Sequence, residues 1–375
     1  MLLRGIRVLA FETGLAGPLC TRLLADLGAE VVKIERPGVG DVTRGWDTIA
    51  GGLSSGFVWV NRGKRSVELD VTDAAERGKV EALVGETDVV VQNFTPGWAD
   101  RVGLDAASLR GRDERLVYTE LSGYGRDGPF ATKNAYDLVM QGETGLILLT
   151  GSKDEPARVG VSICDLATGS YAAVATLAAL VRRAETGVGA HVSVSLFDTM
   201  VDWLGYFPHL WWHRRELPAR TGMHHPLFCP YGPYEGADGL FGIAVLSPQH
   251  WRALCEEVLD RTDLAADPEY ATNEGRVRHR EELDRELADE FRRRPAEDWL
   301  ERLDRAGVPC GHVNDVAQVM EHPQLAHNRL VVEVGSPVGP LPTIGPPFLV
   351  DGERPSGGAV PGLGEHTDVV LGGEQ

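Results

Sequence analysis

Asp165 is the residue whose type and position offer the clearest chemistry in this 375-residue chain. It stands at the start of a predicted Ala-rich helix that runs to about Arg183. One explanation is a plain helix cap. The other is a carboxylate whose pKa the helix N-terminus lowers and which attacks an activated acyl group. The two are compatible, and the small residues at 159–162 supply backbone N–H groups nearby.

Five basic residues form a second candidate site, because they fall in predicted loops after strands or near helix ends. The chain has a formal net charge of −18, so a local group of cations would create an anion-binding pocket in an acidic protein. Solvated surface charge is the alternative for each of them. They are Arg36, Arg62, Lys64, Arg65 and Arg101.

Other motifs carry less information. The glycine turn 14–17 lacks the GxGxxG spacing of a dinucleotide site, and a tight turn without a ligand explains it equally well. His224 and His225 are adjacent and lack the spacing of a metal site, so no metal is expected. Cys164 has no identifiable base that would make it a nucleophile, and the chain contains neither GxSxG nor a P-loop.

Composition excludes several classes of function. The chain is 43% hydrophobic and 25% charged, which is typical of a globular protein. Its negative charge opposes binding to nucleic acid and to acidic membranes. Five cysteines without a CxxC pair fit a reducing compartment. The N-terminal residues do not have the pattern of a signal peptide, and the apolar run 172–181 is too short to span a bilayer, so we expect a cytoplasmic protein.

The first 200 residues alternate β-prone runs with helical patterns, which is typical of an α/β fold with a parallel sheet. The runs are 6–11, 31–34, 67–71, 88–92, 116–119 and 192–196, and the predicted helices include 73–84 and 165–183. After Trp212 the chain becomes rich in proline, glycine and aromatics, and then in charged helices around 251–258, 283–291 and 296–305. We predict a large domain of residues 1–215 and 330–375 and a small domain of residues 216–329.

The order of several short motifs resembles the family III CoA-transferases, also called the CaiB–BaiF family. Each motif is weak alone, but their joint order over nearly the whole chain is specific. They are Gly5–Leu9, Ala16–Pro18, Gly28–Glu35, Asn61–Ser66, Gln92–Gly97, Ser122–Gly125, Asp165 with Gly169, Asp267–Pro268, Gly307–Gly311 and Gly364–Thr367.

The resemblance implies a Rossmann-like large domain and a smaller α+β domain, in two chains threaded through each other as an interlocked homodimer. It also implies a mechanism. Asp165 would attack the thioester of a donor acyl-CoA to form a mixed anhydride, and the released CoA would convert this anhydride into an aspartyl-CoA thioester. An acceptor carboxylate would then receive the CoA.

The resemblance further implies a CoA site. The positions that match are Arg36, Leu69, Asn93, Phe94 and Arg101, and Leu15 and Tyr136 join them. The two arginines are expected near phosphates, and Asn93 and Phe94 along the adenine and pantetheine. Leu15 stands where formyl-CoA transferases have a glutamine, and their glycine-rich flap is missing, which argues against oxalate–formate exchange.

The same family includes 2-methylacyl-CoA racemases, which need an acid/base group on each face of the α-carbon. This chain has Tyr136 where racemases have a histidine and Ser247 where they have a glutamate, so the transferase branch is favoured.

The segment 220–234 is similar to members that act on succinate, itaconate, mesaconate or citramalate. Arg220 or the histidine pair would hold the distal carboxylate. A CoA-binding protein without turnover is a further alternative.

Overall fold

The structure is a computed structural model that describes residues 1–372, and the chain forms two compact units. The first unit contains residues 1–144, 159–205 and the segment from 323 onward. The second contains residues 145–158 and 206–322. The segment 145–158 therefore belongs to the second unit, although in the sequence it lies between two parts of the first.

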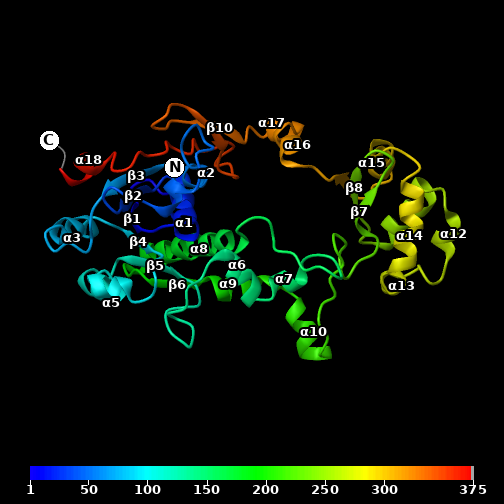
Figure 1. Ribbon diagram of the computed structural model, residues 1–375, viewed down its shortest axis with the longest axis horizontal. Helices are drawn as coiled ribbons and strands as arrows, with labels where there is room; N and C mark the ends of the chain where they lie inside the picture. Colours follow the sequence, from blue (N-terminus) through cyan, green and yellow to red (C-terminus); the bar gives the residue numbers. More distant parts are fainter. Residues whose placement is uncertain (373–375) are drawn as a thin grey trace. The chain divides into compact units, whose positions relative to one another are not determined.

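A six-stranded parallel sheet forms the centre of the first unit (Figure 1). All six β-prone runs overlap its strands, so the prediction of a parallel α/β layer is confirmed, although β3 lies three residues earlier than the predicted run 67–71. Strand order is 3-2-1-4-5-6, the doubly wound order in which the connections reverse direction between β1 and β4. The strands are β1 (Arg7–Phe11), β2 (Glu30–Glu35), β3 (Lys64–Glu68), β4 (Val89–Gln92), β5 (Val117–Ser122) and β6 (His191–Ser195).

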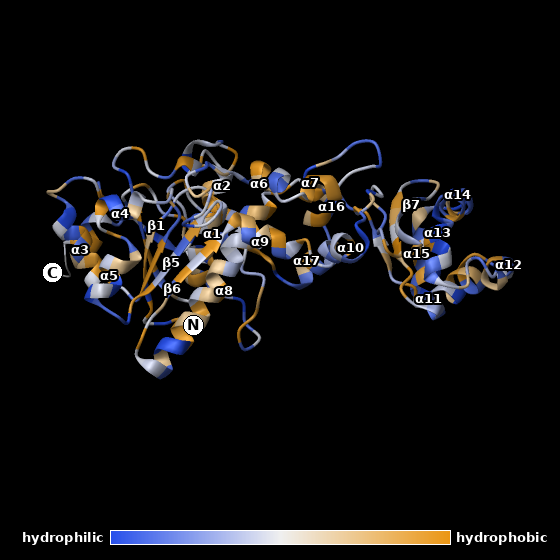
Figure 2. Ribbon diagram, turned by 90° about the horizontal axis from the view of Figure 1, so that it is seen from below, coloured by the Kyte–Doolittle hydropathy of each residue, from blue (hydrophilic) through white to orange (hydrophobic). Residues whose placement is uncertain are grey.

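Helices cover both faces of this sheet, because its central strands are apolar on both sides (Figure 2). On one face, α1 (Ala16–Asp26) and α8 (Ile163–Thr186) pack against alternate residues such as Val8 and Val91. On the other face, α3 (Arg77–Gly85) and α5 (Ala106–Arg112) pack against Leu9 and Val90. The remaining helices of this unit are α2 (Ser55–Asn61), α4 (Trp98–Val102), α6 (Asp137–Glu143), α9 (Leu196–Trp203), α17 (Pro323–His327) and α18 (Thr367–Leu371), with the 3₁₀ turn η1 (Val42–Gly45).

Two predicted helix starts differ from the structure. The helix predicted from residue 73 begins only at Arg77, because the Asp73 carboxylate accepts a hydrogen bond from the Ala75 N–H and forms a turn instead. The helix predicted from Asp165 begins two residues earlier, at Ile163. Asp165 therefore lies within the first turn and is not the capping residue, which is Ser162.

Helix α8 is 24 residues long, and by length and composition alone it could cross a membrane. Half of its most apolar stretch is buried within the protein. The buried side, which includes Ala172 and Ala173, packs on α1 and on the sheet. This burial is the behaviour of a core helix in an α/β protein.

The second unit combines a three-stranded antiparallel sheet with helices around a core that includes Phe241, Phe291 and Trp299. The helix predicted at 296–305 has those bounds in the structure. The strands are β7 (Tyr231–Glu235), β8 (Leu240–Ala244) and β9 (Cys310–His312). The helices are α7 (Leu146–Leu149), α10 (Phe207–Arg214), α11 (Pro248–Ala253), η2 (Leu254–Val258), α12 (Thr262–Ala266), α13 (Asn273–Arg278), α14 (Arg280–Phe291), α15 (Ala296–Arg305) and α16 (Val316–Met320).

The C-terminal segment covers the outer edge of β3, which would otherwise expose unpaired backbone groups. The Gly63 N–H donates to the Ala359 carbonyl at 2.7 Å, and the His366 N–H donates to the Ser66 carbonyl at 2.9 Å. A two-stranded sheet of β10 (Val331–Val334) and β11 (Leu341–Ile344) precedes this segment. The C-terminal segment therefore covers the edge of a sheet whose strands come from the first 200 residues of the chain.

Candidate active site

The carboxyl ends of the first four strands meet at one edge of the sheet, since all of these strands are parallel. Phe11 is paired with Gln92, and Glu35 with Glu68, so the strands end at the same level. Three of the predicted CoA-site residues follow these ends directly, namely Arg36, Leu69 and Asn93, and Leu15 lies in the loop that follows β1. An edge beside the reversal of strand order is where doubly wound sheets bind ligands.

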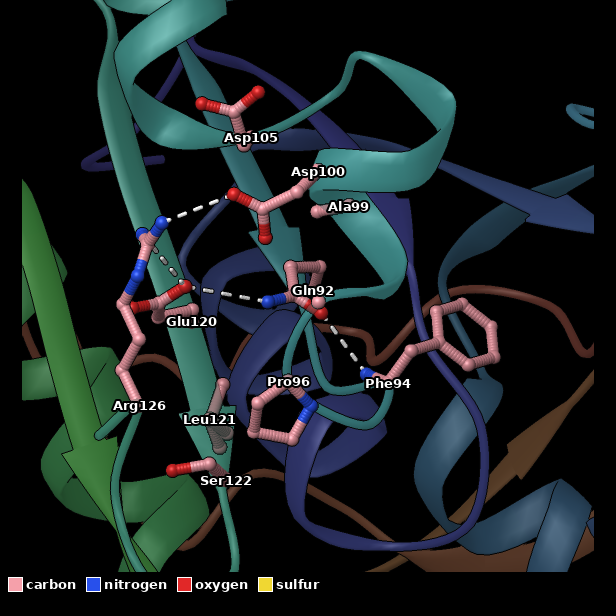
Figure 3. A pocket seen from close by; sticks show the side chains of 11 residues that line it. Gln92, Phe94, Pro96, Ala99, Asp100, Asp105, Glu120, Leu121, Ser122 and Arg126 are labelled. Atoms are coloured by element: carbon pink, nitrogen blue, oxygen red, sulfur yellow. Dashed lines mark hydrogen bonds and ion pairs between the residues drawn. The ribbon is translucent and has the colours of Figure 1, made fainter. Parts of the chain in front are cut away.

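A small enclosed cavity lies beyond the ends of β4 and β5 (Figure 3). Its polar wall is already internally paired, because Arg126 bonds to Asp100 at 3.2 Å and lies 3.8 Å from Glu120. The cavity volume is about 20 Å³, enough for about one water molecule and far too small for a thioester of CoA. Phe94 is one of its lining residues, and Asp165 is not.

The loop between β1 and α1 is held in place by Asn93. Its amide accepts a hydrogen bond from the Thr13 N–H at 2.9 Å and donates one to the Thr13 carbonyl at 2.8 Å. Gly17 makes this possible, because a Cβ at that position would lie 2.8 Å from the Asn93 Cγ. The Asn93 side chain therefore uses its amide group to hold the loop that carries Leu15.

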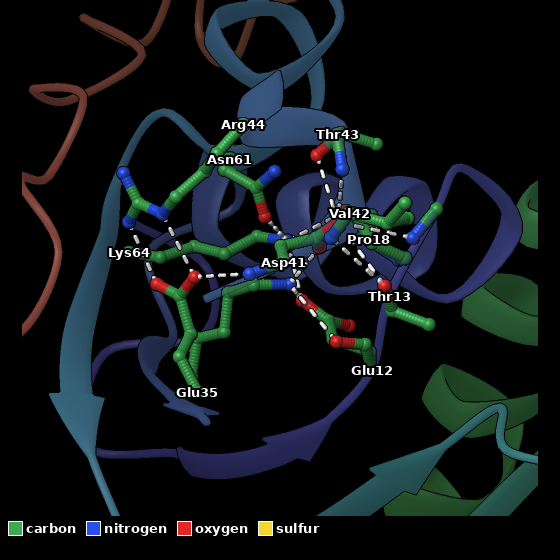
Figure 4. A network of polar contacts seen from close by, with 12 residues as sticks. Glu12, Thr13, Pro18, Glu35, Asp41, Val42, Thr43, Arg44, Asn61 and Lys64 are labelled. Carbon is green, nitrogen blue, oxygen red and sulfur yellow. Dashed lines mark hydrogen bonds and ion pairs between the residues drawn. The ribbon is translucent and has the colours of Figure 1, made fainter. Parts of the chain in front are cut away.

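A buried charge network contacts the same loop, because Asp41 accepts hydrogen bonds from the Thr13 hydroxyl and the Gly14 N–H, both at 3.2 Å (Figure 4). Lys33 donates to Asp41 at 2.7 Å, and Lys64 donates to Glu12 at 2.7 Å. Burial opposes ionisation of Asp41, but the charge of Lys33 and hydrogen bonds from Thr43 outweigh it and lower the pKa of Asp41 to about 2. Burial lowers the pKa of Lys64 to about 8, against the raising effect of Glu12. Sequence reasoning missed this network, because no residue spacing indicates it.

The structure divides the five candidate cations into two groups. Arg62 is fully buried and pairs with Asp26, Lys64 pairs with Glu12, and Arg65 pairs with Glu30. These three cations are therefore already neutralised. Arg36 and Arg101 are exposed, and within residues 1–372 neither side chain makes a hydrogen bond or an ion pair. Only these two of the five remain available to a phosphate group.

Three further predicted residues differ in accessibility. Leu69 is only 2% exposed and belongs to the core between the sheet and α3, so its side chain is not available for direct contact with a ligand. Phe94 is partly exposed and packs against Trp98, with ring centroids 4.4 Å apart. Tyr136 is 78% exposed and stands immediately before α6. The aromatic surfaces of Phe94 and Tyr136 are therefore open to a ligand.

Asp165 is brought toward the β1–α1 loop by the packing of α8 against α1. Gly169, one helical turn after Asp165, touches the start of α1 so closely that a Cβ there would lie 2.6 Å from the Ala16 carbonyl oxygen. Residues four apart share one face of a helix, so Asp165 lies on the side of α8 that faces α1. Leu15, which precedes α1, is thereby near the start of α8.

The Asp165 carboxylate is partly buried and makes no hydrogen bond or ion pair with residues 1–372. Burial raises its pKa from 3.8 to about 7, and the negative charge of Asp137 adds to this effect. The direction is opposite to the predicted lowering by the helix N-terminus, since loss of water and a second carboxylate outweigh the helix dipole. Asp165 is therefore not a structural cap but an unpartnered acid with a raised pKa.

The neighbouring Cys164 is not a competing nucleophile. It is fully buried, and its thiol donates to the Asp137 carbonyl at 3.5 Å. Burial, followed by the charge of Asp137, raises the pKa of Cys164 far above its ordinary value. The thiol is therefore neutral and enclosed.

The residues expected to hold a distal carboxylate lie in the second unit, where Arg220 and His225 already have partners. The Nδ1 atom of His224 is buried and has no hydrogen-bond partner within residues 1–372. Arg220 donates to the carbonyls of Ser152 and Lys153 at 2.9 and 2.8 Å. His225 stacks on Tyr231, with ring centroids 4.9 Å apart. Burial, and then the charge of Arg280, lowers the pKa of His225, which disfavours the charged form of its ring. Within residues 1–372, no group of three or more histidines, cysteines or acids could hold a metal ion.

Comparison with known proteins identifies the family. Residues 3–367 match the protein family described as CoA-transferase family III. The acetyl-CoA:oxalate CoA-transferase of Acetobacter aceti is 36% identical, covering 94% of this chain and 91% of its own. Human succinyl-CoA:glutarate CoA-transferase is 33% identical, covering 98% and 85%. Succinyl-CoA:mesaconate CoA-transferase of Haloarcula hispanica is 36% identical, covering 98% and 94%.

Solved structures agree with this assignment. The crystal structure of Rv3272 from Mycobacterium tuberculosis has a TM-score of 0.88 at 31% identity and covers 98% of both chains. A CaiB/BaiF family protein from Brucella suis has a TM-score of 0.85 at 35% identity, over 99% of this chain and 98% of that one. The chain belongs to CoA-transferase family III and is an enzyme that moves CoA between acyl-CoA and carboxylic acids.

Proposed function

We propose that this enzyme transfers CoA to and from a small dicarboxylic acid, with Asp165 as the nucleophile. The observation that carries the proposal is the Asp165 carboxylate, which has no partner and a raised pKa and lies at a helix start that packs against the β1–α1 loop. A carboxylate in such an environment is poorly stabilised as an anion. It is therefore a more reactive nucleophile than an exposed aspartate.

The reaction proceeds through two kinds of covalent intermediate. An Asp165 oxygen attacks the donor thioester, the C–S bond breaks, and CoA leaves as a thiolate. The thiolate then attacks the aspartyl carbonyl of the mixed anhydride and releases the donor acid, which leaves an aspartyl-CoA thioester. The acceptor carboxylate attacks this thioester, and the freed thiolate attacks the acceptor carbonyl of the new anhydride. Acyl-CoA is formed and Asp165 is regenerated.

The role proposed for each residue in CoA binding follows from whether its side chain is exposed at the edge of the sheet. Arg36 and Arg101 are free cations and would meet phosphate groups. Leu15, Phe94 and Tyr136 would line the path toward Asp165. Leu69 and Asn93 would act indirectly, the first by filling the core behind the site and the second by holding the loop. No metal is required for any of these contacts.

The substrate class rests on the relatives, which are named for oxalate, glutarate and mesaconate. A panel of acyl-CoA donors and carboxylate acceptors, followed by mass spectrometry of the CoA products, tests it. We expect succinate and related dicarboxylates to be the preferred acceptors, with acetate as the matched monocarboxylate control. A preference for bulky aromatic or steroid acids would contradict the dicarboxylate proposal.

Racemisation is the competing activity, and the same incubation carried out in D₂O distinguishes it. Ser247, at the position of a racemase glutamate, caps α11 by accepting a hydrogen bond from the His250 N–H at 3.1 Å. Tyr136 replaces the histidine and has an ordinary phenol in place of an imidazole. Exchange of the α-proton for deuterium without any transfer of CoA would favour a racemase.

We also propose that the enzyme is an interlocked homodimer. The outward side of α8 presents an apolar stripe at helical spacing: Tyr171, Val174 and Val181 are 40%, 62% and 64% exposed. Such a stripe on a core helix needs a covering partner, and a second copy would provide it. Sedimentation equilibrium at micromolar concentration should give twice the 40.6 kDa mass of the chain. A monomeric mass with full activity would contradict the proposal.

A cytoplasmic location is part of the same proposal. All five cysteines are free, and four of them are buried. Free buried thiols are typical of proteins that work in a reducing compartment.

A further inference from the structure

Asp137 holds the start of the helix that carries Asp165. It is the first residue of α6, and its side chain is buried. One carboxylate oxygen accepts a hydrogen bond from the Cys164 N–H at 2.9 Å. That N–H is one of the donors that a helix N-terminus leaves without a partner inside the helix. Ser162, which occupies the capping position of α8, makes no capping hydrogen bond with its side chain, so Asp137 performs this role from another helix.

Gln141 fixes Asp137 in this position. Its amide nitrogen donates to the second Asp137 oxygen at 2.7 Å, and its amide oxygen accepts from the Val159 N–H at 2.8 Å. Gln141 is fully buried. The two side chains therefore connect α6 to both ends of the short segment 159–164 that leads into α8. The position of Asp165 depends on this connection.

The geometry points to Asp137 as the positioning residue of the active site, with Gln141 as its orienting partner. Asp137 satisfies the helix start in place of Asp165, which leaves the Asp165 carboxylate without a structural task and free to react. The inference rests on the proposed role of Asp165 as nucleophile. It adds that a second carboxylate, which does not touch the substrate, sets the position and the reactivity of the first.

Asp137 also acts on Asp165 through its charge. From α1, the uncharged Ala16 and Leu19 pack against α8 at Gly169, one turn after Asp165. The neighbouring Cys164 thiol is neutral. Asp137 is the charged residue that acts on Asp165 within the described chain, and its negative charge disfavours ionisation of the nucleophile. Removal of that charge should therefore lower the pH at which Asp165 ionises.

The test is the pH profile of covalent adduct formation at Asp165, measured by acid quench and mass spectrometry after mixing enzyme with succinyl-CoA. In the wild type, the rate should fall below pH about 7. In Asp137→Asn, the midpoint should move to lower pH by about one unit. The plateau rate should also fall about tenfold or more, because the new amide would face the Gln141 amide nitrogen donor to donor and misplace the helix start.

A double variant separates charge from position. In Asp137→Asn/Gln141→Glu, the new amide can donate to the new carboxylate, which can also accept from the Val159 N–H. The plateau rate should recover most of its loss. The midpoint should stay below that of the wild type, because the negative charge would then stand at residue 141, which bonds to Val159, and no longer at residue 137, which bonds to the Cys164 N–H beside Asp165. If the single variant does not fold, the double variant still allows the midpoint and the plateau rate to be compared with those of the wild type. Asp198→Asn, in the exposed first turn of α9, is the matched control and should change neither quantity.

The outcomes are distinguishable from failure of the proposed function. If the wild type forms no adduct at Asp165, the nucleophile proposal fails. If the wild type forms the adduct and Asp137→Asn has an unchanged midpoint and plateau, the positioning role of Asp137 is refuted. A plateau loss without a change of midpoint in either variant would refute the electrostatic part of the inference.

Discussion

Asp165→Asn is expected to reduce CoA transfer by about 10⁴-fold or more, because it removes the nucleophile and keeps the shape of the side chain. Binding of CoA should change little, since the contacts proposed for CoA lie on other residues. The measurement is steady-state transfer with succinyl-CoA, together with the dissociation constant for CoA from calorimetry. Asp198→Asn, an exposed aspartate at the start of α9, provides the matched control.

Stability distinguishes loss of a nucleophile from loss of structure. A carboxyl whose pKa is about 7 when folded and 3.8 otherwise stabilises the fold most below pH 3.8 and loses this contribution as the pH rises toward 7. At pH 8 the wild type carries the full cost of an ionised, partly buried Asp165. Asp165→Asn should therefore be at least as stable as the wild type at pH 8 in urea unfolding, and its advantage should shrink as the pH falls below 7. A variant that unfolds more easily at pH 8 would indicate a structural role.

Arg36→Ala and Arg101→Ala are each expected to weaken CoA binding by about 10-fold to 100-fold, which is the range for loss of a charge-assisted hydrogen bond. Both guanidinium groups are exposed and unpaired within residues 1–372, so their removal leaves no buried charge behind. The fold should be unaffected. Calorimetric titration with CoA and with dephospho-CoA measures the loss, and the variant that discriminates less between the two ligands identifies the arginine nearer the 3′-phosphate.

Arg65→Ala is the matched control for these variants. Arg65 belongs to the same candidate group of cations, but it pairs with Glu30 at 2.8 Å on the surface. Its removal should leave the affinity for CoA within about twofold, as expected for a surface ion pair. Equal losses in all three variants would show that overall charge, and not a specific contact, governs binding.

Strands β1, β2, β4 and β5 were predictable from sequence, because apolar residues, many of them β-branched, form short runs that are almost entirely buried. β6 was predictable from its alternation of apolar and polar residues, whereas β3 begins with Lys64 and Arg65 and was predicted three residues too late. The α8 helix was predictable for the same kind of reason, although its first residue was not. The Asp73 turn that delays α3 depends on a single side-chain hydrogen bond. No periodicity in the sequence carries such information.

The candidate site was predictable only in part. The position of Asp165 at a helix start could be inferred from the pattern around it, but the sign of its pKa change could not. That sign depends on burial and on Asp137, which comes from a different helix. The sequence also could not show which of the five cations are paired and which are free. Arg62 and Lys64 look like surface charges in the sequence, and only the structure shows their buried partners Asp26 and Glu12.

Trapping of the covalent intermediate tests the central claim most directly. The enzyme is mixed with succinyl-CoA, quenched with hydroxylamine, digested and analysed by mass spectrometry. An activated carboxyl forms a hydroxamate under these conditions, and an ordinary carboxylate does not. The proposal predicts a hydroxamate on Asp165 that requires succinyl-CoA and is absent from Asp165→Asn. Turnover in the same reaction with no modified carboxyl, or with modification of a different acid, would contradict it.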